Sequence, residues 1–258
     1  LWVSREHIFP GASVFTCAPT IQVGGPRTTP LQRFMGNNFA PIGALDIDQD
    51  QLAEEATWAP LAAAAWGIPE IDLKGHRILG EVARATADFR DQYYGLKGFL
   101  VEDAQITRPA QNLSNRFPPV VTAGLVDLAK CRWGESTTRI LKQRWSAPRV
   151  DRARMDAEGT LGPWIRDRLT PKVLVATQTR VIEAFVDADG TRVPSTPLVS
   201  VFPHRSRDIW RVAAALASPV CTAVALQRYA GAALTPHAIK RPASPVTPLP
   251  APSSYGAR

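Results

Sequence analysis

The sequence predicts an α+β protein, in which small mixed or antiparallel sheets pack against helices. Residues 173–175 and 181–186 are apolar runs rich in β-branched side chains, which is typical of strands. The turn signal Asp187-Ala-Asp-Gly190 follows, so that residues 191–193 can return as a paired strand in a two- or three-stranded antiparallel platform. Residues 78–94 instead place apolar side chains at helical spacing, before a stop at Gly95.

The segments before residue 78 predict less regular structure. Residues 14–18 and 20–23 are short strand candidates, and two strands alone do not make a stable sheet. Residues 24–43 are rich in Gly, Pro and Asn, which predicts a loop. Residues 46–65 are acidic and Ala-rich, as in a helix whose acids lie near its start.

The segments after the predicted platform alternate between strand and helix signals. Residues 198–202 predict a further strand. Asp208 can cap a helix that ends at Ser218-Pro219, and residues 220–229 predict a second helix. Beyond residue 236 the chain is rich in proline, which favours an extended tail.

Composition indicates a globular chain with a preference for polyanions. The 258 residues are 45% hydrophobic and 21% charged, with a formal net charge of +7. A basic excess favours partners such as nucleic acid. Cys17, Cys131 and Cys221 lie far apart, which excludes a disulfide framework and is consistent with a reducing cytoplasm. No apolar run reaches membrane-spanning length, so no membrane partner is expected.

Motifs that would build an active site or a metal site are missing. The four histidines have no neighbouring ligand at a metal spacing, and Asp46, Asp48 and Asp50 are not followed by the Gly and Glu of a calcium loop. Ser13 is not in a glycine-flanked nucleophile motif, and no glycine loop precedes a helix in the way that a phosphate-binding loop does. We therefore expect no catalytic residue, no metal and no bound cofactor in this chain.

A run of cations between residues 130 and 180 is the strongest functional signal. Trp133, Trp145 and Trp164 are interleaved with it. Clustered cations with aromatic side chains are typical of a nucleic-acid groove. A solvated cationic face with surface ion pairs, such as Arg152 and Arg154 beside Asp151 and Asp156, remains the alternative. The cations are Lys130, Arg132, Arg139, Lys142, Arg144, Arg149, Arg152, Arg154, Arg166, Arg168, Lys172 and Arg180.

Several separated motifs resemble one family, the N6-adenine DNA methyltransferases of restriction-modification type, and in particular their TaqI-like target-recognition domain. The motifs occur in the family's order and cover roughly residues 93–250. They are Tyr94-Gly-Leu-Lys-Gly98, Val121-Thr-Ala-Gly-Leu-Val126 with Cys131-Arg-Trp-Gly134, Pro171-Lys-Val-Leu-Val-Ala-Thr177, Ala214-Ala-Leu-Ala-Ser-Pro219, and Ile239-Lys240 with Leu249-Pro250. Residues 9–23 resemble the last strands of the family's Rossmann-like catalytic domain.

The resemblance implies a division of labour between catalysis and recognition. In the family a catalytic domain binds S-adenosylmethionine and flips an adenine out of the duplex, because its N6 atom is otherwise hydrogen-bonded inside the stack. The family's Asn/Asp-Pro-Pro-aromatic motif is absent, since Pro118-Pro119 lies between Phe117 and Val120. We therefore expect the C-terminal portion of such an enzyme, inactive alone, with its cofactor and catalytic motifs lying upstream.

The expected organisation follows from this resemblance. Residues 1–24 would be terminal strands of the catalytic domain, 25–93 a loop and helical connector, 94–242 the DNA target-recognition domain, and 243–258 a Pro-rich tail. The expected partners are double-stranded DNA and a methyltransferase catalytic domain, in the same chain or in a separate subunit. The alternatives are a stand-alone, non-enzymatic specificity subunit and a general basic nucleic-acid-binding protein. The expected location is a bacterial-type cytoplasm, in association with DNA.

Six residues are the predicted DNA contacts. Residue type and position place Lys142, Arg144, Arg149 and Lys172 on phosphates, and Gln178 and Arg180 nearest the base edges. The resemblance carries over only to Lys172. We expect these side chains to line one concave, positively charged surface, with Trp133 and Trp145 as packing residues.

Overall fold

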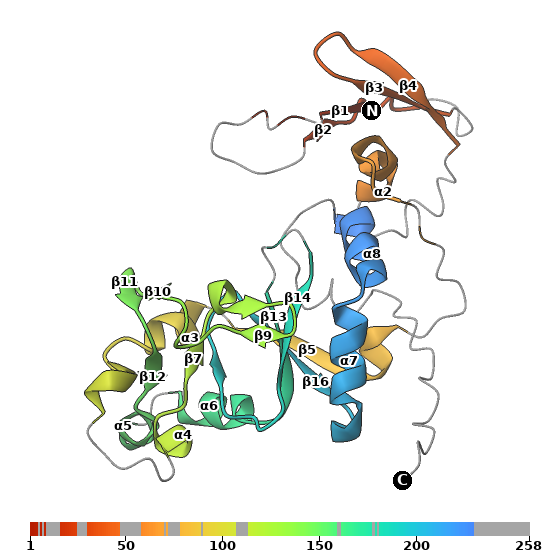
Figure 1. The fold of residues 1–258 in the computed structure, drawn as a ribbon. Coiled ribbons are helices and arrows are strands. Elements are labelled where there is room, and N and C mark those ends of the chain that lie inside the picture. The colour runs from red at the N-terminus through yellow and green to blue at the C-terminus, as the bar shows by residue number, and fades with distance from the viewer. Residues whose placement is uncertain are drawn as a thin grey trace, which may run out of the picture. The chain divides into compact units, whose positions relative to one another are not determined.

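The computed structural model describes residues 1–4, 6, 8, 16–24, 30–46, 58–69, 71, 78–88, 90–106, 113–158, 161–176, 179 and 181–229. The chain divides into two compact units (Figure 1). The first, unit 1, contains Leu1–Asp72 together with Ala223–Ala233, and the second, unit 2, contains Leu73–Thr222. Both combine helices with small sheets, which confirms the predicted α+β class.

Unit 1 contains a four-stranded sheet. Its strand order is β2-β1-β3-β4, with β1 parallel to β3 and the other pairs antiparallel. Val3, Ala62 and Ala65 form its small buried core, against which Met35 and Trp66 pack. The elements are β1 (Trp2–Val3), β2 (Cys17–Ala18), β3 (Leu31–Met35), β4 (Ala40–Leu45), α2 (Ala59–Ala63) and the 3-10 helix η1 (Ala64–Trp66).

The hairpin β3–β4 corrects the predicted loop at residues 24–43. Gly36 has a φ of 73° and Phe39 a φ of 51°, so the chain reverses between the two strands. Pro41 is tolerated in β4 because this is an edge strand, where one side of the backbone needs no ladder hydrogen bond. In the described part of this stretch, Gly36 and Pro41 therefore belong to the turn and the edge strand of a hairpin, not to a connecting loop.

The strands of unit 2 form one four-stranded sheet and several two-stranded sheets. The larger sheet has the order β14-β13-β16-β5 and is antiparallel throughout. The strands are β5 (Ala83–Ala87), β6 (Leu100–Glu102), β7 (Val120–Val121), β8 (Val126–Asp127), β9 (Lys130–Cys131), β10 (Thr138–Ile140), β11 (Gln143–Trp145), β12 (Pro148–Val150), β13 (Lys172–Ala176), β14 (Glu183–Asp187), β15 (Val193–Pro194) and β16 (Val199–Pro203).

The helices of unit 2 are mostly short. The α-helix α7 contacts β13, β14 and β16 and buries Ile209, Val212, Ala213 and Leu216. The helices are η2 (Leu79–Glu81), α3 (Arg90–Gly95), η3 (Asp103–Gln105), α4 (Leu113–Arg116), η4 (Ala123–Leu125), α5 (Arg152–Ala157), α6 (Gly162–Arg168), η5 (Ser206–Asp208), α7 (Ile209–Leu216) and α8 (Pro219–Tyr229), of which α8 continues into unit 1.

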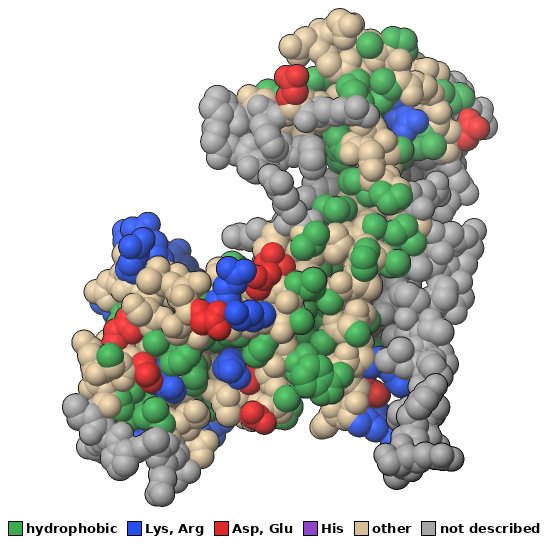
Figure 2. All heavy atoms as spheres, viewed as in Figure 1, with side chains coloured by type: hydrophobic (Ala, Val, Ile, Leu, Met, Phe, Trp, Pro, Cys, Tyr) green, Lys and Arg blue, Asp and Glu red, His purple; other side chains and the backbone are tan. Residues whose placement is uncertain are grey.

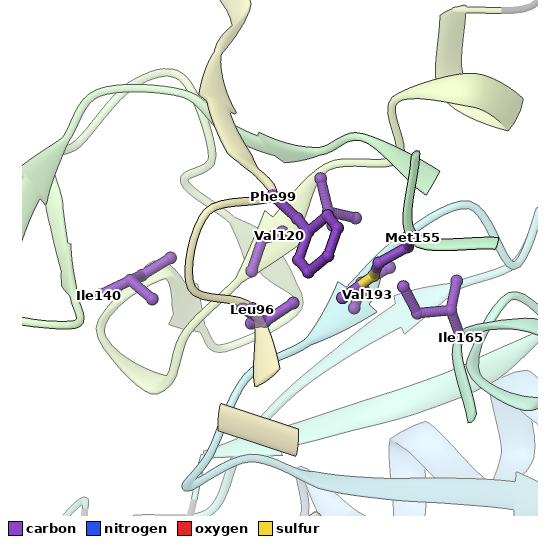
Figure 3. Packing of buried hydrophobic residues seen from close by; sticks show 8 residues of the cluster. Leu96, Phe99, Val120, Ile140, Met155, Ile165 and Val193 are labelled. Carbon is purple, nitrogen blue, oxygen red and sulfur yellow. The ribbon is translucent and has the colours of Figure 1, made fainter. Parts of the chain in front are cut away.

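Hydrophobic clusters among the described residues stabilise unit 2. In the first, Leu96, Phe99, Val120, Met155 and other apolar side chains converge from several short elements (Figure 3). In the second, side chains of β13 and Leu198, which directly precedes β16, pack against apolar residues of β7, η4 and β8. Because strand residues alternate between faces, one face of the larger sheet packs on these short strands and the other on α7.

The larger sheet pairs differently from the prediction. Its hairpin joins β13 to β14, with Val173 opposite Val186, whereas Val193 of β15 runs parallel to β7. The turn after β14 is as predicted. Gly190 has a φ of 63°, and a Cβ atom there would lie 2.4 Å from the Thr170 carbonyl carbon, so only glycine fits. The predicted strand at residues 198–202 is confirmed by β16.

The predicted helix at residues 78–94 is wrong. Residues 83–87 form β5, which pairs with β16 and alternates buried Ala83 and Ala85 with exposed Arg84. Ala and Arg favour helix locally, but pairing with a strand over 100 residues later overrides that preference. Only α3 and the single-turn helix η2 are helical in this stretch. Strand β5 of the larger sheet therefore comes from the segment that was expected to be a connector.

Among the described residues, no single helix has the length and apolarity to cross a membrane. The stretches Ser206–Leu216 and Pro219–Arg228 reach the required length and composition only together, and they are bent by 66°.

Burial of Cys221 predicts a measurable pH dependence of stability. Burial raises the pKa of this thiol from 9.0 to about 12. The folded state thus holds a proton that the unfolded state loses between pH 9 and 12, so the thiol's contribution is complete below pH 9 and falls as pH rises. We expect the free energy of unfolding to decline above pH 9 by up to about 1.4 kcal/mol per pH unit from this group.

The measurement is denaturant unfolding at pH 8 to 10.5 of the wild type and of Cys221→Ala. The difference in stability between the two chains should shrink as the pH rises. A difference that stays constant over this range would show that the thiol titrates normally in the fold.

Candidate nucleic-acid interface

The hairpin β10–β11 brings together three cations within residues 139–144. Its register places Arg139 opposite Arg144 and Ile140 opposite Gln143, and Lys142 lies in the turn. Arg139, Lys142 and Arg144 are all exposed. No acidic residue occurs between Glu135 and Asp151, so the hairpin contains no compensating charge of its own.

The inner side of the hairpin is fixed to the rest of unit 2. Ile140 is completely buried in the first hydrophobic cluster, where Leu141 and Trp145 also pack. The Tyr93 hydroxyl accepts from the Leu141 backbone N–H at 2.8 Å. The Thr138 hydroxyl lies 2.5 Å from that of Thr122. The hairpin is therefore a firmly seated element whose outer side presents the cations.

Charge pairing separates this hairpin from most other cations of the basic run. Arg139, Lys142 and Arg144 form no ion pair with any residue that the structure describes. Most other exposed cations of the run are neutralised by a nearby carboxylate. These pairs are Lys130–Glu135, Arg132–Asp127, Arg152–Asp156, Arg154–Glu158 and Arg166–Asp156. In Figure 2, blue side chains gather over β10–β11 without adjacent red ones, whereas several other blue groups of unit 2 on this face have red neighbours.

Two features of the hairpin cost stability. Like charges directly opposite each other across an antiparallel pair repel, as Arg139 and Arg144 do. The turn residues Leu141 and Lys142 have φ values of 52° and 67°, a left-handed conformation that favours Asn or Gly and costs other residues about 1–2 kcal/mol each. Local strain of this kind is typical of functional segments.

The prediction for Arg149 does not agree with its position. This residue is only 7% exposed, and its Nε atom donates to Asp103 while Nη1 donates to the Phe117 carbonyl at 2.7 Å. Its guanidinium group stacks on the Trp133 ring, 4.7 Å from the centroid. The donors of Arg149 are therefore used inside the protein, and we remove it from the candidate interface.

The prediction for Lys172 fails for the same physical reason. Its side chain is fully buried, and Nζ donates to Asp187 at 2.6 Å and to the Thr170 carbonyl at 3.3 Å. Asp187 also accepts from the backbone N–H groups of Thr191 and Arg192 and from the Arg192 guanidinium. Burial lowers the pKa of Lys172, although the Asp187 carboxylate opposes this shift. An ammonium group enclosed in this way is not available to a phosphate.

Of the six predicted contacts, Lys142 and Arg144 lie together on the hairpin. Arg149 and Lys172 lie apart from them. The predicted concave surface lined by all of these cations is therefore not formed. Gln178 and Arg180 lie outside the described residues, and their predicted roles stay predictions. Arg139 belongs to the predicted basic run but not to the six predicted contacts. Its place opposite Arg144 in a short strand–turn–strand pattern is the signal that would have indicated a contact there.

Trp133 and Trp145 are packing residues, as predicted, and Trp164 packs in the same way. The indole N–H of Trp133 donates to the Pro148 carbonyl at 2.9 Å, and that of Trp145 donates to the Ile140 carbonyl. The indole N–H of Trp164 donates to Asp88, a buried carboxylate that also binds Arg168. These three aromatic side chains therefore support the fold. The cations of the β10–β11 hairpin remain as exposed polar groups.

Metal chemistry has no support in this part of the chain. Within the described ranges, no group of three or more His, Cys, Asp or Glu side chains is close enough to hold a metal ion.

No family model and no curated protein matches this sequence. The function proposed below therefore depends on the geometry and on the motif resemblance.

Proposed function

We propose that unit 2 binds double-stranded DNA through the β10–β11 hairpin. The observation that carries this proposal is the set of three exposed, unpaired cations on one anchored hairpin, at Arg139, Lys142 and Arg144. A duplex carries one phosphate charge per about 1.7 Å of its axis, and cations that neutralise phosphates release counterions on binding. Unpaired cations bind phosphate best because no internal carboxylate has to be displaced first.

The shape of the hairpin is compatible with a duplex groove. The major groove of B-form DNA is about 12 Å wide and admits a two-stranded β-ribbon. Arg139 and Arg144 lie opposite each other and share the outer face of the hairpin, whereas Gln143 lies opposite the buried Ile140 and therefore on the other face. The two arginines would approach the duplex together, from the outer face of the hairpin.

The proposed biological role is target recognition for adenine-N6 methylation that uses S-adenosylmethionine. It is supported by the family motifs, several of which lie in unit 2 around its first hydrophobic cluster and the larger sheet. The transfer would be made by a catalytic domain of the family type, in the same polypeptide or in a separate subunit. In this division of labour, the described residues hold the duplex and supply no group that reacts.

General nucleic-acid binding is the second candidate function. It is favoured by the composition of the hairpin, because Arg and Lys on phosphates bind every sequence about equally. The residues predicted to read bases, Gln178 and Arg180, lie outside the described part of the chain.

The experiment that tests target recognition is selection from a pool of random duplexes. The full chain is immobilised, bound duplexes are recovered at about 0.15 M salt, and the cycle is repeated. Target recognition predicts enrichment of one short sequence, with a loss of about 1–3 kcal/mol for each mismatched base pair. Uniform recovery of all sequences would contradict target recognition and leave general binding, and a failure to retain any duplex would contradict both functions.

A further inference from the structure

A cavity of about 620 Å³ opens in unit 2 between η2 and the start of α7. Its two walls are joined by the pairing of β5 with β16, and the His204 backbone N–H donates to the Val82 carbonyl at 2.9 Å. The charged or ionisable side chains that line the cavity, none of which belongs to the β10–β11 hairpin, are Glu81, His204, Arg205, Arg207, Asp208 and Arg211.

Positive charge is in excess in this cavity. Three guanidinium groups line it together with two carboxylates, those of Glu81 and Asp208. Asp208 accepts from Arg211, whose Nη1 atom lies 3.3 Å from its Oδ1 atom. Arg205 and Arg207 are exposed and form no ion pair with any residue that the structure describes. The cavity therefore holds two guanidinium groups whose charge no described carboxylate neutralises.

The local structure places these like charges close together. Arg205 directly precedes η5, and η5 continues into α7 without a break, so the three arginines lie on one short stretch of chain, residues 205–211. Arg207 and Arg211 are four residues apart, and like charges at this spacing on a helix repel each other. An anion bound between the arginines relieves this repulsion, whereas a cation would increase it. The charge of the cavity therefore selects an anionic ligand.

The chemistry of the arginines narrows the class of anion. A guanidinium group is a planar fork of N–H donors that matches two oxygens of a phosphate group. We propose that the cavity binds a phosphate-type oxyanion through Arg205, Arg207 and Arg211. Its volume of about 620 Å³ falls within the range of small-molecule sites, about 300–1,000 Å³. The shared chemistry is a phosphate group, which a small phosphate compound and a nucleic-acid backbone both carry.

The first test is calorimetric titration of the full chain with inorganic pyrophosphate. The variant Arg205→Gln/Arg207→Gln is compared with Arg154→Gln/Arg166→Gln, which loses the same charge at arginines already paired with carboxylates. We expect the first variant to bind pyrophosphate at least about tenfold more weakly than the wild type, because two charge-assisted donor groups are lost, and the control to bind it as the wild type does. Without ligand, the three chains should melt at closely similar temperatures, because the substituted side chains are exposed.

Asp208 provides a second test, of opposite sign. Its carboxylate competes with the anion for Arg211, and its side chain forms no cap hydrogen bond with α7. We expect Asp208→Asn to bind pyrophosphate several-fold more tightly than the wild type. The control Asp127→Asn removes the same charge and frees Arg132 outside the cavity, so it should leave the affinity unchanged. Unchanged or weaker binding by Asp208→Asn would contradict the assignment of Arg211 to the site.

A competition arm identifies the source of the phosphate. The variant Arg139→Gln/Lys142→Gln/Arg144→Gln, which lacks the hairpin cations, is titrated with pyrophosphate in the presence and absence of a DNA duplex. Displacement of pyrophosphate by the duplex identifies the nucleic-acid backbone as the source, and its absence identifies a small phosphate compound. Pyrophosphate binding by this variant without duplex should equal that of the wild type, so this site and the proposed function can fail separately. The proposal is overturned if pyrophosphate fails to bind the wild type at millimolar concentration, or if the cavity variant and its control bind it equally.

Discussion

Replacing Asp187 by alanine is expected to lower the free energy of unfolding by about 3–5 kcal/mol, the cost of leaving a buried charge without its partner. Asp187 is fully buried, and its two oxygens accept from the Lys172 ammonium, the Arg192 guanidinium and two backbone N–H groups. The substitution would strand the Lys172 ammonium in the interior. Denaturant unfolding of the two chains at neutral pH measures the effect.

A second substitution separates charge from packing in this result. Adding Lys172→Met to the Asp187→Ala chain removes the stranded ammonium, so the double variant should be more stable than Asp187→Ala alone. If Asp187→Ala costs less than about 0.5 kcal/mol, the pair behaves like an exposed surface pair. That outcome would contradict the buried position of Lys172 and restore it as a candidate for phosphate contact.

Removing the hairpin cations is expected to weaken duplex binding on the order of a hundredfold at about 50 mM salt. The change is the triple variant Arg139→Gln/Lys142→Gln/Arg144→Gln, which keeps polar side chains at the exposed positions. Each cation lost removes a charge-assisted bond to phosphate. Its removal also relieves the repulsion between the opposed arginines, so we expect the fold to be as stable as the wild type or slightly more stable. Fluorescence anisotropy of a labelled duplex measures the affinity.

The matched control is Arg152→Gln/Arg154→Gln/Arg166→Gln. It removes the same charge from the same unit, at arginines that are already paired with carboxylates. If binding depends on the hairpin, this variant should lose only a few-fold in affinity. Equal losses in the two triple variants would show that the duplex responds to net charge alone.

The sequence predicts the local elements of the larger sheet but not its partners. The β-branched run at residues 173–175 lies in β13 and the turn at Gly190 lies where expected, because both depend on local conformational preference. The pairing of β5 with β16 depends on residues more than 100 positions apart, and nothing local at Ala83 or Ala85 indicates it. Helix propensity therefore gave the wrong structure there.

The local sequence also does not predict which individual cations are buried. Lys172 and Arg149 look like members of an exposed basic run, but their carboxylate partners Asp187 and Asp103 lie 15 and 46 residues away along the chain. A buried lysine is found almost only when it is paired, and the pairing depends on strand register. Lys142 and Arg144 could be predicted as exposed because no acid occurs near them in the sequence.

The salt dependence of duplex binding tests the central claim most directly. Log affinity is measured against log salt between about 50 and 200 mM for the wild type, the hairpin variant and the matched control. Each phosphate contact contributes about 0.9 to the slope, so three hairpin contacts contribute about 2.7. The account predicts that the hairpin variant loses most of this slope while the control keeps it. A hairpin variant with the slope of the wild type would contradict the claim that Arg139, Lys142 and Arg144 hold the DNA backbone.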